Sequence, residues 1–490
     1  MSSAPRTDDS DRPRRLRALF LSLVATVGVF LAAEAAVRLI GIEPAELPLD
    51  AKHFFFRGVR VDPVLGWLLR PGWHGNWLLS EFDVQADERG FRSTGHSSPA
   101  APSCRVAFLG DSCSFGWGMS TPDTFVAQLD DLQRAKGEPT CDLMNAAFPG
   151  QSAVVGAHIL RERVLRYRPD VVVIAFSAHN AFRFALVSDI DRLRFAPVRK
   201  LVLRSRLLSV IAAWWANHST PAVNPRQPAV VVSRPLADLR RVADAGEYDA
   251  ALRTMVDEAR AHNATPLFLL LPRRCMVSAD DAEEDAAMVA SQLTARQQDG
   301  GSAAPAEVHA LETSCLDHRT IDDPVGALYE RRDTWHAVYP QDPELRDALR
   351  DGARAFVAGD YARATQSFIA ALERQPDSPL ARYDLGVVKL ASGDQTGGMR
   401  ELEEADRLAC SAFLHYNVLA WRVARDLAVP VVDITLYFQA HDGEPLFLDP
   451  AHPNRAGHVI IAGALQAALE RDGRPTNEPS SAPGARRTPR

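Results

Sequence analysis

The sequence Arg105-Val-Ala-Phe-Leu-Gly-Asp-Ser112 runs from a short apolar segment through a glycine into a turn that carries a serine. The apolar part has the length of a buried strand, and glycine suits the tight turn that ends such a strand. A serine at the carboxyl end of a strand, just before a helix, lies where open α/β sheets place their ligands. This stretch therefore predicts a central strand and a candidate reactive side chain directly after it.

Four further segments have the apolar character of this strand: 141–145, 170–176, 266–272 and 429–433. Helical stretches lie between strands, for example over 123–136, 151–166 and 249–262. Strands that alternate with helices form parallel sheets covered on both faces. We therefore expect an α/β fold with three layers, α/β/α, around a five-stranded parallel sheet.

The composition excludes several classes of protein. The chain has 490 residues, of which 46% are hydrophobic and 24% charged, so disorder throughout and a polytopic membrane protein are both excluded. A net charge of −7 argues against a nucleic-acid binder with a basic surface. Six cysteines, without a CxxC pair, and no HExxH sequence give no support for a disulfide-built scaffold or a zinc site. We expect no cofactor and no metal.

The N-terminal region has the pattern of a membrane-spanning helix. Four arginines between residues 12 and 17 precede the stretch 18–37, in which Glu34 is the one charged residue. Twenty helical residues extend about 30 Å, the thickness of a bilayer core. The basic near flank and acidic far flank predict a cytoplasmic segment 1–17, an inner-membrane anchor over 18–40, and a remainder of the chain that faces the periplasm. The alternative is a cleaved signal peptide, because Ala33-Glu-Ala35 has the small-x-small form of a cleavage site.

The remaining segments complete the expected organisation of the chain. An aromatic-rich, strand-rich prelude precedes an α/β domain in two parts, and the insert between these parts begins with a polar, flexible stretch. The chain ends in a tail that is disordered by composition. The expected bounds are 43–103 for the prelude, 104–278 and 409–472 for the two parts of the α/β domain, 279–344 for the flexible stretch and 473–490 for the tail.

An internal repeat occupies residues 345–408. Gly352 and Gly386 lie 34 residues apart, and small and apolar residues recur at matching offsets. This period resembles the tetratricopeptide repeat, and the alternative is an ordinary helical hairpin. Two units are fewer than the three that usually stand alone, so we expect them to lean on the main domain and to offer a surface to a protein partner. We also expect the α/β domain to fold when 345–408 is replaced by a short linker.

The residues with the chemistry of a hydrolase lie after the predicted strands. Asp449 and His452 are three residues apart, so one short loop can deliver a carboxylate that orients an imidazole. A serine nucleophile such as Ser112 needs this base. Gly150 and Asn180 follow the second and third strands and offer a backbone N–H and a side-chain NH₂ to a developing oxyanion.

These blocks, in this order, resemble the SGNH (GDSL-type) hydrolase superfamily. The resemblance implies a flavodoxin-like fold. It also implies that Ser112 is the nucleophile, His452 the base and Asp449 the residue that orients His452. The resemblance also implies an oxyanion hole formed by the Ser112 amide, Gly150 and Asn180. The third block departs from the family's Gly-x-Asn-Asp, because His179 precedes Asn180 and Ala181 follows it. The sequences Asp62-Pro-Val-Leu-Gly-Trp67 and Gly90-Phe-Arg92 resemble the prelude of membrane-tethered bacterial members.

The expected function is that of an exported, membrane-anchored serine esterase acting on an acyl ester of a cell-envelope glycan or a lipid. The same residues also serve a glycan O-acyltransferase if an alcohol outcompetes water. A non-enzymatic scaffold that carries the repeats on a degenerate hydrolase fold is the alternative from another class.

Two smaller expectations concern pairs of elements. Cys104 and Cys141 begin the first two strands, and adjacent strands bring Cα atoms within the separation that a disulfide accepts. An exported protein allows this pair to oxidise. The segment 199–215 is basic and amphipathic, which fits either a helix on the membrane surface or a cap over the active site.

Overall fold

The computed structural model describes residues 12–41, 58–62, 65–76, 82–137, 141–176, 180, 183–185, 189–211, 240–276, 340, 342–409, 412–449 and 451–472. These residues fall into two units. The first includes helices α1 (Arg12–Leu39) and α7 (Ala196–Arg204), and the second contains the sheet. Most of the predicted flexible stretch 279–344 and the whole predicted tail 473–490 lie outside the described residues.

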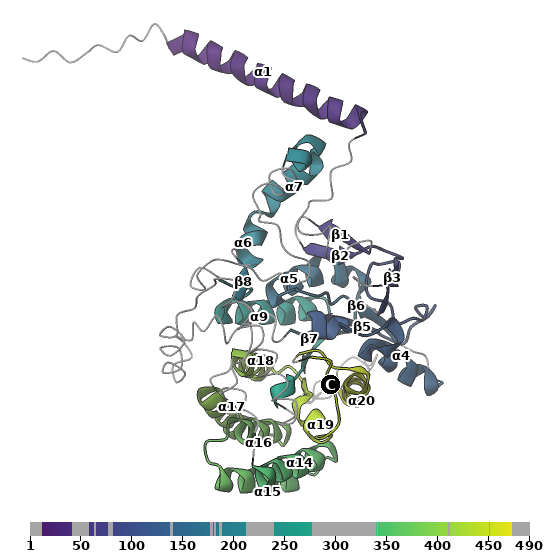
Figure 1. Ribbon diagram of the computed structural model, residues 1–490, viewed down its shortest axis with the longest axis vertical. Coiled ribbons are helices and arrows are strands. Elements are labelled where there is room, and N and C mark those ends of the chain that lie inside the picture. The colour runs from purple at the N-terminus through teal and green to yellow at the C-terminus, as the bar shows by residue number, and fades with distance from the viewer. Residues whose placement is uncertain are drawn as a thin grey trace, which may run out of the picture. The chain divides into compact units, whose positions relative to one another are not determined.

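The second unit is built on the predicted five-stranded parallel sheet (Figure 1). Its order, β11-β10-β7-β5-β6, is the flavodoxin-like order in which the first strand lies between the second and the third. The first strand has the predicted bounds, and the others differ from the predicted segments by one or two residues at an end. The strands are β5 (Arg105–Gly110), β6 (Asp142–Asn145), β7 (Val171–Ala175), β10 (Thr265–Leu270) and β11 (Val431–Asp433).

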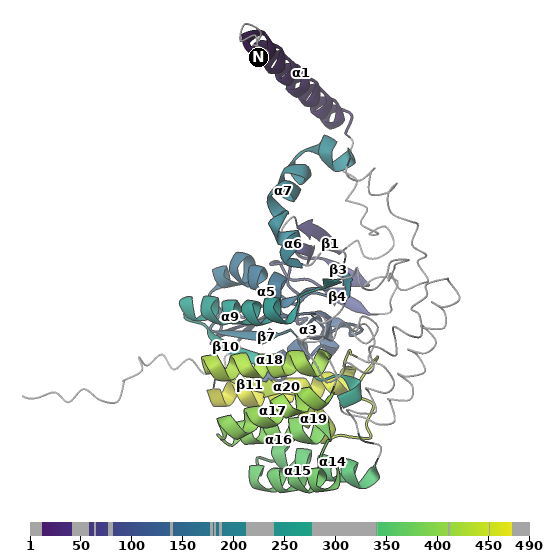
Figure 2. The ribbon, with the colours of Figure 1, turned by 90° about the vertical axis from the view of Figure 1, so that its left-hand side faces the viewer.

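Helices cover both faces of this sheet, as expected. The chain moves in one direction from β6 through β7 and β10 to β11, so right-handed crossovers place α5, α9 and α18 on one face. These helices pack against one another (Figure 2), whereas α4 packs with α20 in the other layer (Figure 1). Their bounds are α4 (Phe125–Ala135), α5 (Ala153–Ile159), α9 (Ala245–Ala261), α18 (Ala412–Leu427) and α20 (Arg455–Asp472).

The core lies between these layers. All five residues of β7 are buried, which explains why its sequence is continuously apolar instead of alternating. The helix predicted over 151–166 continues beyond α5 as a π-helical turn, Leu160–Val164, and a 3₁₀ turn, Leu165–Tyr167. Its apolar spacing indicated a helix without revealing the change in hydrogen bonding.

The described part of the prelude is strand-rich, as predicted. It forms two small sheets, one of β1 (Val59–Asp62) and β2 (Gly66–Leu69), the other of β3 (His74–Asn76) and β4 (Asp83–Gln85). The chain then reaches the main sheet, where the N–H of Arg92 donates to the carbonyl of Asn145 at 2.9 Å. The end of the prelude is therefore held beside β6.

Four helices occupy the region of the predicted repeats: α14 (Pro343–Val357), α15 (Tyr361–Arg374), α16 (Pro379–Ala391) and α17 (Gln395–Ala409). They pack consecutively as two hairpins. A Cβ on Gly352 would lie 2.6 Å from the ring of Phe368, and a Cβ on Gly386 would lie 2.8 Å from Leu402. Each hairpin thus uses a glycine for the same close helix approach, one 34-residue period apart.

The four helices lean on the domain that contains the parallel sheet, as expected. The hydroxyl of Tyr383 in α16 donates to Asp433 Oδ2 at 2.5 Å, at the end of β11. The indole of Trp421 in α18 donates to the same oxygen at 3.0 Å. Arg354 in α14 donates to the carbonyl of Ala440, which follows α19 (Thr435–Gln439). Replacing 345–408 would remove the Tyr383 donor from Asp433 and leave the donor from Trp421, and folding without this segment stays a prediction.

Candidate active site

The turn after β5 presents Ser112 at the carboxyl end of the sheet. Asp111 precedes the short helix α3 (Ser112–Phe115), and its carboxylate accepts from the N–H of Cys113 at 3.0 Å. A Cβ on Gly110 would lie 2.7 Å from the carbonyl oxygen of Ala175, so the neighbouring strand leaves no room for a side chain there. Glycine thus permits the close approach that places Ser112 at the start of α3, half-buried.

A loop before α20 brings the imidazole to this serine. His452 Nε2 lies 2.7 Å from Ser112 Oγ, and His452 Nδ1 lies 2.7 Å from Asp449 Oδ2. The other oxygen of Asp449 accepts from the N–H groups of Ala451 and His452, at 2.8 and 2.9 Å. One carboxylate therefore shapes the loop and orients the ring. This arrangement is able to move a proton from a serine hydroxyl to an imidazole.

The charge state of Asp449 suits that role. Burial by itself would raise the pKa of this carboxyl group, but the charge of His452 and the hydrogen bonds from its ring and from two backbone amides outweigh burial. The pKa of Asp449 is consequently held well below its ordinary value, and the carboxylate is ionised at neutral pH.

The two candidate oxyanion residues follow β6 and β7. Gly150 has φ of +77°, in the left-handed region that favours glycine. Asn180 is fully buried, and its Oδ1 accepts from the N–H of Ala153 at the start of α5, at 2.8 Å. This bond fixes the orientation of the amide group, so its NH₂ is the donor face of the side chain. His179 lies outside the described residues.

Arg92 is a residue of this region that the sequence analysis named without assigning it a role. Its side chain is buried and donates to the carbonyls of Phe115, at 2.7 Å, of Gly116, at 2.8 Å, and of Met119. Its guanidinium also lies 4.4 Å from the centre of the Phe115 ring. Burial lowers the pKa of Arg92 to about 9, partly offset by the charge of Asp83, so the group stays cationic at neutral pH. The prelude thus supplies a cation to the carboxyl end of α3.

Aromatic side chains flank the imidazole. The ring centres of Trp117 and His452 are 6.0 Å apart, and the ring of Phe82 lies 5.9 Å from that of Trp117. Leu448 packs where a side chain on Gly118 would lie. The imidazole of His452 therefore has an aromatic ring beside it. Among the described residues, no group of three or more His, Cys, Asp or Glu is arranged to hold a metal ion.

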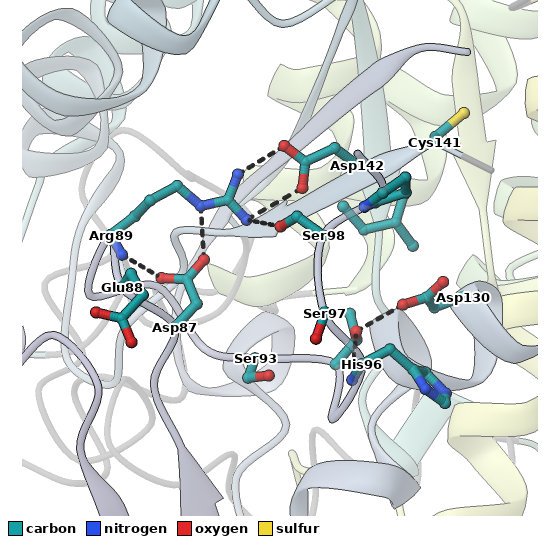
Figure 3. Close-up of a pocket in the computed structure, with 13 residues that line it drawn as sticks. Asp87, Glu88, Arg89, Ser93, His96, Ser97, Ser98, Asp130, Cys141 and Asp142 are labelled. Atoms are coloured by element: carbon teal, nitrogen blue, oxygen red, sulfur yellow. Dashed lines mark hydrogen bonds and ion pairs between the residues drawn. The ribbon is translucent and has the colours of Figure 1, made fainter. Parts of the chain in front are cut away.

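A polar cavity of about 420 Å³ lies elsewhere, near the amino ends of β5 and β6 (Figure 3). Arg89 reaches across it and binds Asp142 through both terminal nitrogens, at 2.7 and 3.1 Å, and Asp87 through Nε, at 2.6 Å. Beside it, Cys104 and Cys141 form the expected disulfide, with Cα atoms 4.5 Å apart. The lining includes an arginine, a histidine and four carboxyl residues, and none of the predicted site residues; the carboxyl residues are Asp87, Glu88, Asp130 and Asp142.

Comparison with known proteins gives one family match. Residues 108–336 match the model of the GDSL-like lipase/acylhydrolase family. The match includes Ser112, Gly150 and Asn180 and ends before the helical insert, so Asp449 and His452 lie outside it. No curated protein is significantly similar to this chain in sequence.

Several solved structures are similar to the chain at low TM-scores. TesA is 17% identical, with 34% of this chain and 61% of TesA covered at a TM-score of 0.21. A lipase/acylhydrolase from Enterococcus faecalis is 12% identical, with 75% and 96% covered at 0.32. A variant of an acetyl-xylooligosaccharide esterase from a Geobacillus species is 13% identical, with 76% and 96% covered at 0.32. The chain therefore spans less than two thirds of TesA and almost the full length of the other two.

Proposed function

We propose that this chain, an ester hydrolase whose residues 108–336 match the GDSL-like lipase/acylhydrolase family, cleaves acyl esters with Ser112 as nucleophile. His452 is the general base, and Asp449 orients it. The observation that carries the proposal is the continuous hydrogen-bonded series from Ser112 Oγ through His452 to the ionised Asp449.

In the proposed reaction, Ser112 Oγ attacks the ester carbonyl while His452 Nε2 accepts the hydroxyl proton. The carbonyl oxygen becomes an oxyanion and receives hydrogen bonds from the amides of Ser112 and Gly150 and from the NH₂ of Asn180. The tetrahedral intermediate expels the alcohol, to which His452 returns the proton. Water then attacks the acyl-serine with the same base and releases the acid.

The proposed location is the outer face of a membrane. The segment Phe20–Leu39 of α1 is long and apolar enough to span a bilayer. A cleaved signal peptide would satisfy the same test, but cleavage after Ala35 would remove Glu34 from the chain. Glu34 forms hydrogen bonds with Ser205, Arg206 and Leu207, which supports retention of the helix. We propose that the substrate is an acyl ester of the cell envelope, either on a glycan or on a lipid.

A chromogenic acetyl ester and a fluorophosphonate probe test the catalytic proposal. Wild type is expected to hydrolyse the ester and to bind the probe at Ser112, whereas Ser112→Ala loses both and remains folded. Ser98→Ala changes a serine that accepts from Arg89 at the cavity and serves as the matched control. Full turnover by Ser112→Ala would exclude Ser112 as the nucleophile.

Product analysis separates the hydrolase from the acyltransferase. The purified protein receives an acyl donor with and without a glycan acceptor, and the acid and the acylated glycan are measured. Release of acid in both reactions supports the esterase, and acyl transfer that depends on the glycan supports the transferase.

A further inference from the structure

Glu34 is the one charged residue in the stretch 18–37 of α1. The side chains around it in α1 are largely exposed, whereas that of Glu34 is 13% exposed. Its carboxylate accepts from Arg38 Nε at 2.7 Å, from Ser205 Oγ at 2.8 Å, and from the N–H groups of Arg206 and Leu207 at 3.0 and 2.9 Å. A charged residue is costly in a membrane helix. The carboxylate of Glu34 is stabilised by hydrogen bonds from a segment about 170 residues further along the chain.

The bonds to Glu34 cap a helical segment. Residues 206–211 are helical, and Ser205 Oγ accepts from the N–H of Leu208 at 3.0 Å, as an N-cap serine does. Glu34 accepts from the two amides before Leu208. The guanidinium of Arg38, one turn further along α1, donates to the carbonyl of Arg204 at 3.3 Å. Glu34 and Arg38 of α1 therefore bind the amide donors and the carbonyl acceptor that lie between α7 and the helical segment 206–211.

This junction lies at a defined depth along the anchor. Glu34 is five residues before Leu39, where the apolar segment ends, which is about 7.5 Å at a rise of 1.5 Å per residue. Amphipathic helices at membrane surfaces bury their apolar face by about 5–10 Å at the boundary of headgroups and acyl chains. The segment held by Glu34 is consequently at the level that an interfacial helix occupies.

The preceding helix, α7, has the matching surface. Val198 and Leu201 are three residues apart, hence on one face, and are 58% and 63% exposed. Lys200 and Arg204 are exposed, and Lys200, two residues after Val198, lies on the opposite side of the helix from it. Such a helix places apolar side chains among acyl chains and basic groups beside anionic headgroups.

We propose that residues 194–211 are a second membrane-contacting element, which lies in the outer interface of the bilayer and docks on the anchor through Glu34. The proposal rests on the proposed anchoring. The element begins after Asn180 and β8 (Arg183–Ala185) and returns to the hydrolase domain at β9 (Arg240–Arg241), which pairs with β8. The catalytic domain is thereby connected to the lipid surface by an internal segment as well as by its N-terminus, which favours esters presented at the membrane.

Site-specific labels test this element in the full-length protein. Cys275, Cys315 and Cys410 are replaced by serine, and a bimane is attached at Val198→Cys, Leu201→Cys or, as the matched control, Lys200→Cys. The protein is reconstituted in vesicles of phosphatidylcholine and phosphatidylglycerol with nitroxide-labelled acyl chains. We expect labels at 198 and 201 to be quenched several-fold more than the label at 200.

A variant that combines Leu201→Cys with Glu34→Leu loses the hydrogen bonds from Glu34 to residues 205–207. Its membrane segment no longer contains a carboxylate and is therefore more apolar. We expect this variant to float with vesicles as wild type does, while quenching of the label at 201 falls toward the level at 200. Equal quenching at 198, 200 and 201 in floating wild-type protein overturns the inference alone. So does a blue-shifted label that acyl-chain nitroxides do not quench, because a protein surface would then cover the face.

Loss of flotation distinguishes the remaining failure. A protein that stays soluble beside the vesicles overturns the proposed anchor together with this element. Hydrolysis of a soluble chromogenic ester by each labelled variant is unchanged in all these outcomes if the catalytic proposal is correct, since none of the labelled residues belongs to the proposed catalytic machinery.

Discussion

The two ends of the parallel sheet use the same kinds of residue for different purposes. At the carboxyl ends, Asp449 holds an imidazole against a hydroxyl, and both partners remain half-buried beside a turn. At the amino ends, Asp142 and Asp87 bind Arg89, and two cysteines close a disulfide. A carboxylate is suited to proton transfer where its partner can exchange a proton, and it is suited to stabilising the fold where its partner is a permanent cation.

The largest effect is expected when the base at the carboxyl end is removed. His452→Ala leaves Ser112 without a proton acceptor, and turnover of a chromogenic ester falls to background, on the order of 10⁶-fold. The double variant with Ser112→Ala loses no more, because the two residues act as one unit. His262→Ala, before β10, is the control and retains turnover. Additive losses would show that the two side chains act separately.

Asp449→Asn tests the orientation of the base. The amide retains an oxygen for the backbone of the loop but loses the charge that stabilises an imidazolium. We expect kcat to fall about 10⁴-fold, with folding retained. The matched change, Asp142→Asn at the amino end, is expected to lower stability to urea and leave kcat of the folded protein intact. Equal losses of kcat in the two variants would contradict the comparison.

Two variants of Asn180 distinguish a role in oxyanion binding from a role in packing. Asn180→Ala removes the NH₂ donor and is expected to lower kcat by about 10²–10³. It also removes the acceptor for the N–H of Ala153, so stability falls too. Asn180→Asp restores an acceptor without the donor. If this variant regains stability while kcat stays low, Asn180 is an oxyanion donor, and if kcat recovers with stability, its role is structural.

Removal of the disulfide changes only the amino end of the sheet. Cys104 and Cys141 are separated by 37 positions in the sequence, and opening a loop of this size is expected to lower the free energy of unfolding by about 2–4 kcal/mol. Cys104→Ser should therefore shift the urea midpoint downward while the folded protein keeps its kcat. Free-thiol titration of the unfolded variant should detect one more thiol than wild type, because Cys141 loses its partner.

His458 tests whether proximity to the reacting groups suffices for a catalytic role. It lies six residues after His452, but it is buried and its Nδ1 accepts from the N–H of Phe125 at 3.0 Å. Burial, together with the charges of Arg92 and His452, lowers the pKa of His458 to about 3. The unfolded chain binds a proton near pH 6.5 and the native state does not, so stability falls as the pH is lowered from about 6.5 toward about 3.

Denaturation of wild type and His458→Gln at two pH values measures this effect. Relative to the variant, wild type is expected to lose about 2 kcal/mol of unfolding free energy between pH 7 and pH 5. The variant isolates His458 from the other titrating groups, including the buried Asp384 and Asp433, whose pKa values burial raises. A constant difference between the two proteins would show that His458 titrates normally.

The sequence alone determined the local parts of this protein. Eight residues, 105–112, are enough to predict a strand, the glycine that ends it and the turn that carries the serine. Strand length and turn chemistry are short-range properties, so a local sequence reveals them. The three-residue spacing of Asp449 and His452 likewise allows one loop to hold both groups. The pairing of Cys104 with Cys141 followed from the expectation that their strands are neighbours.

Only the tertiary structure decided which distant groups meet. Arg92 belongs to the prelude yet binds three carbonyls at and after α3, and Tyr383 of the insert donates to Asp433 at the end of β11. Glu34, an isolated charge in the sequence, receives the amides of residues 206 and 207. No periodicity encodes these contacts, because each depends on how complete elements pack and on which buried polar group then needs a partner.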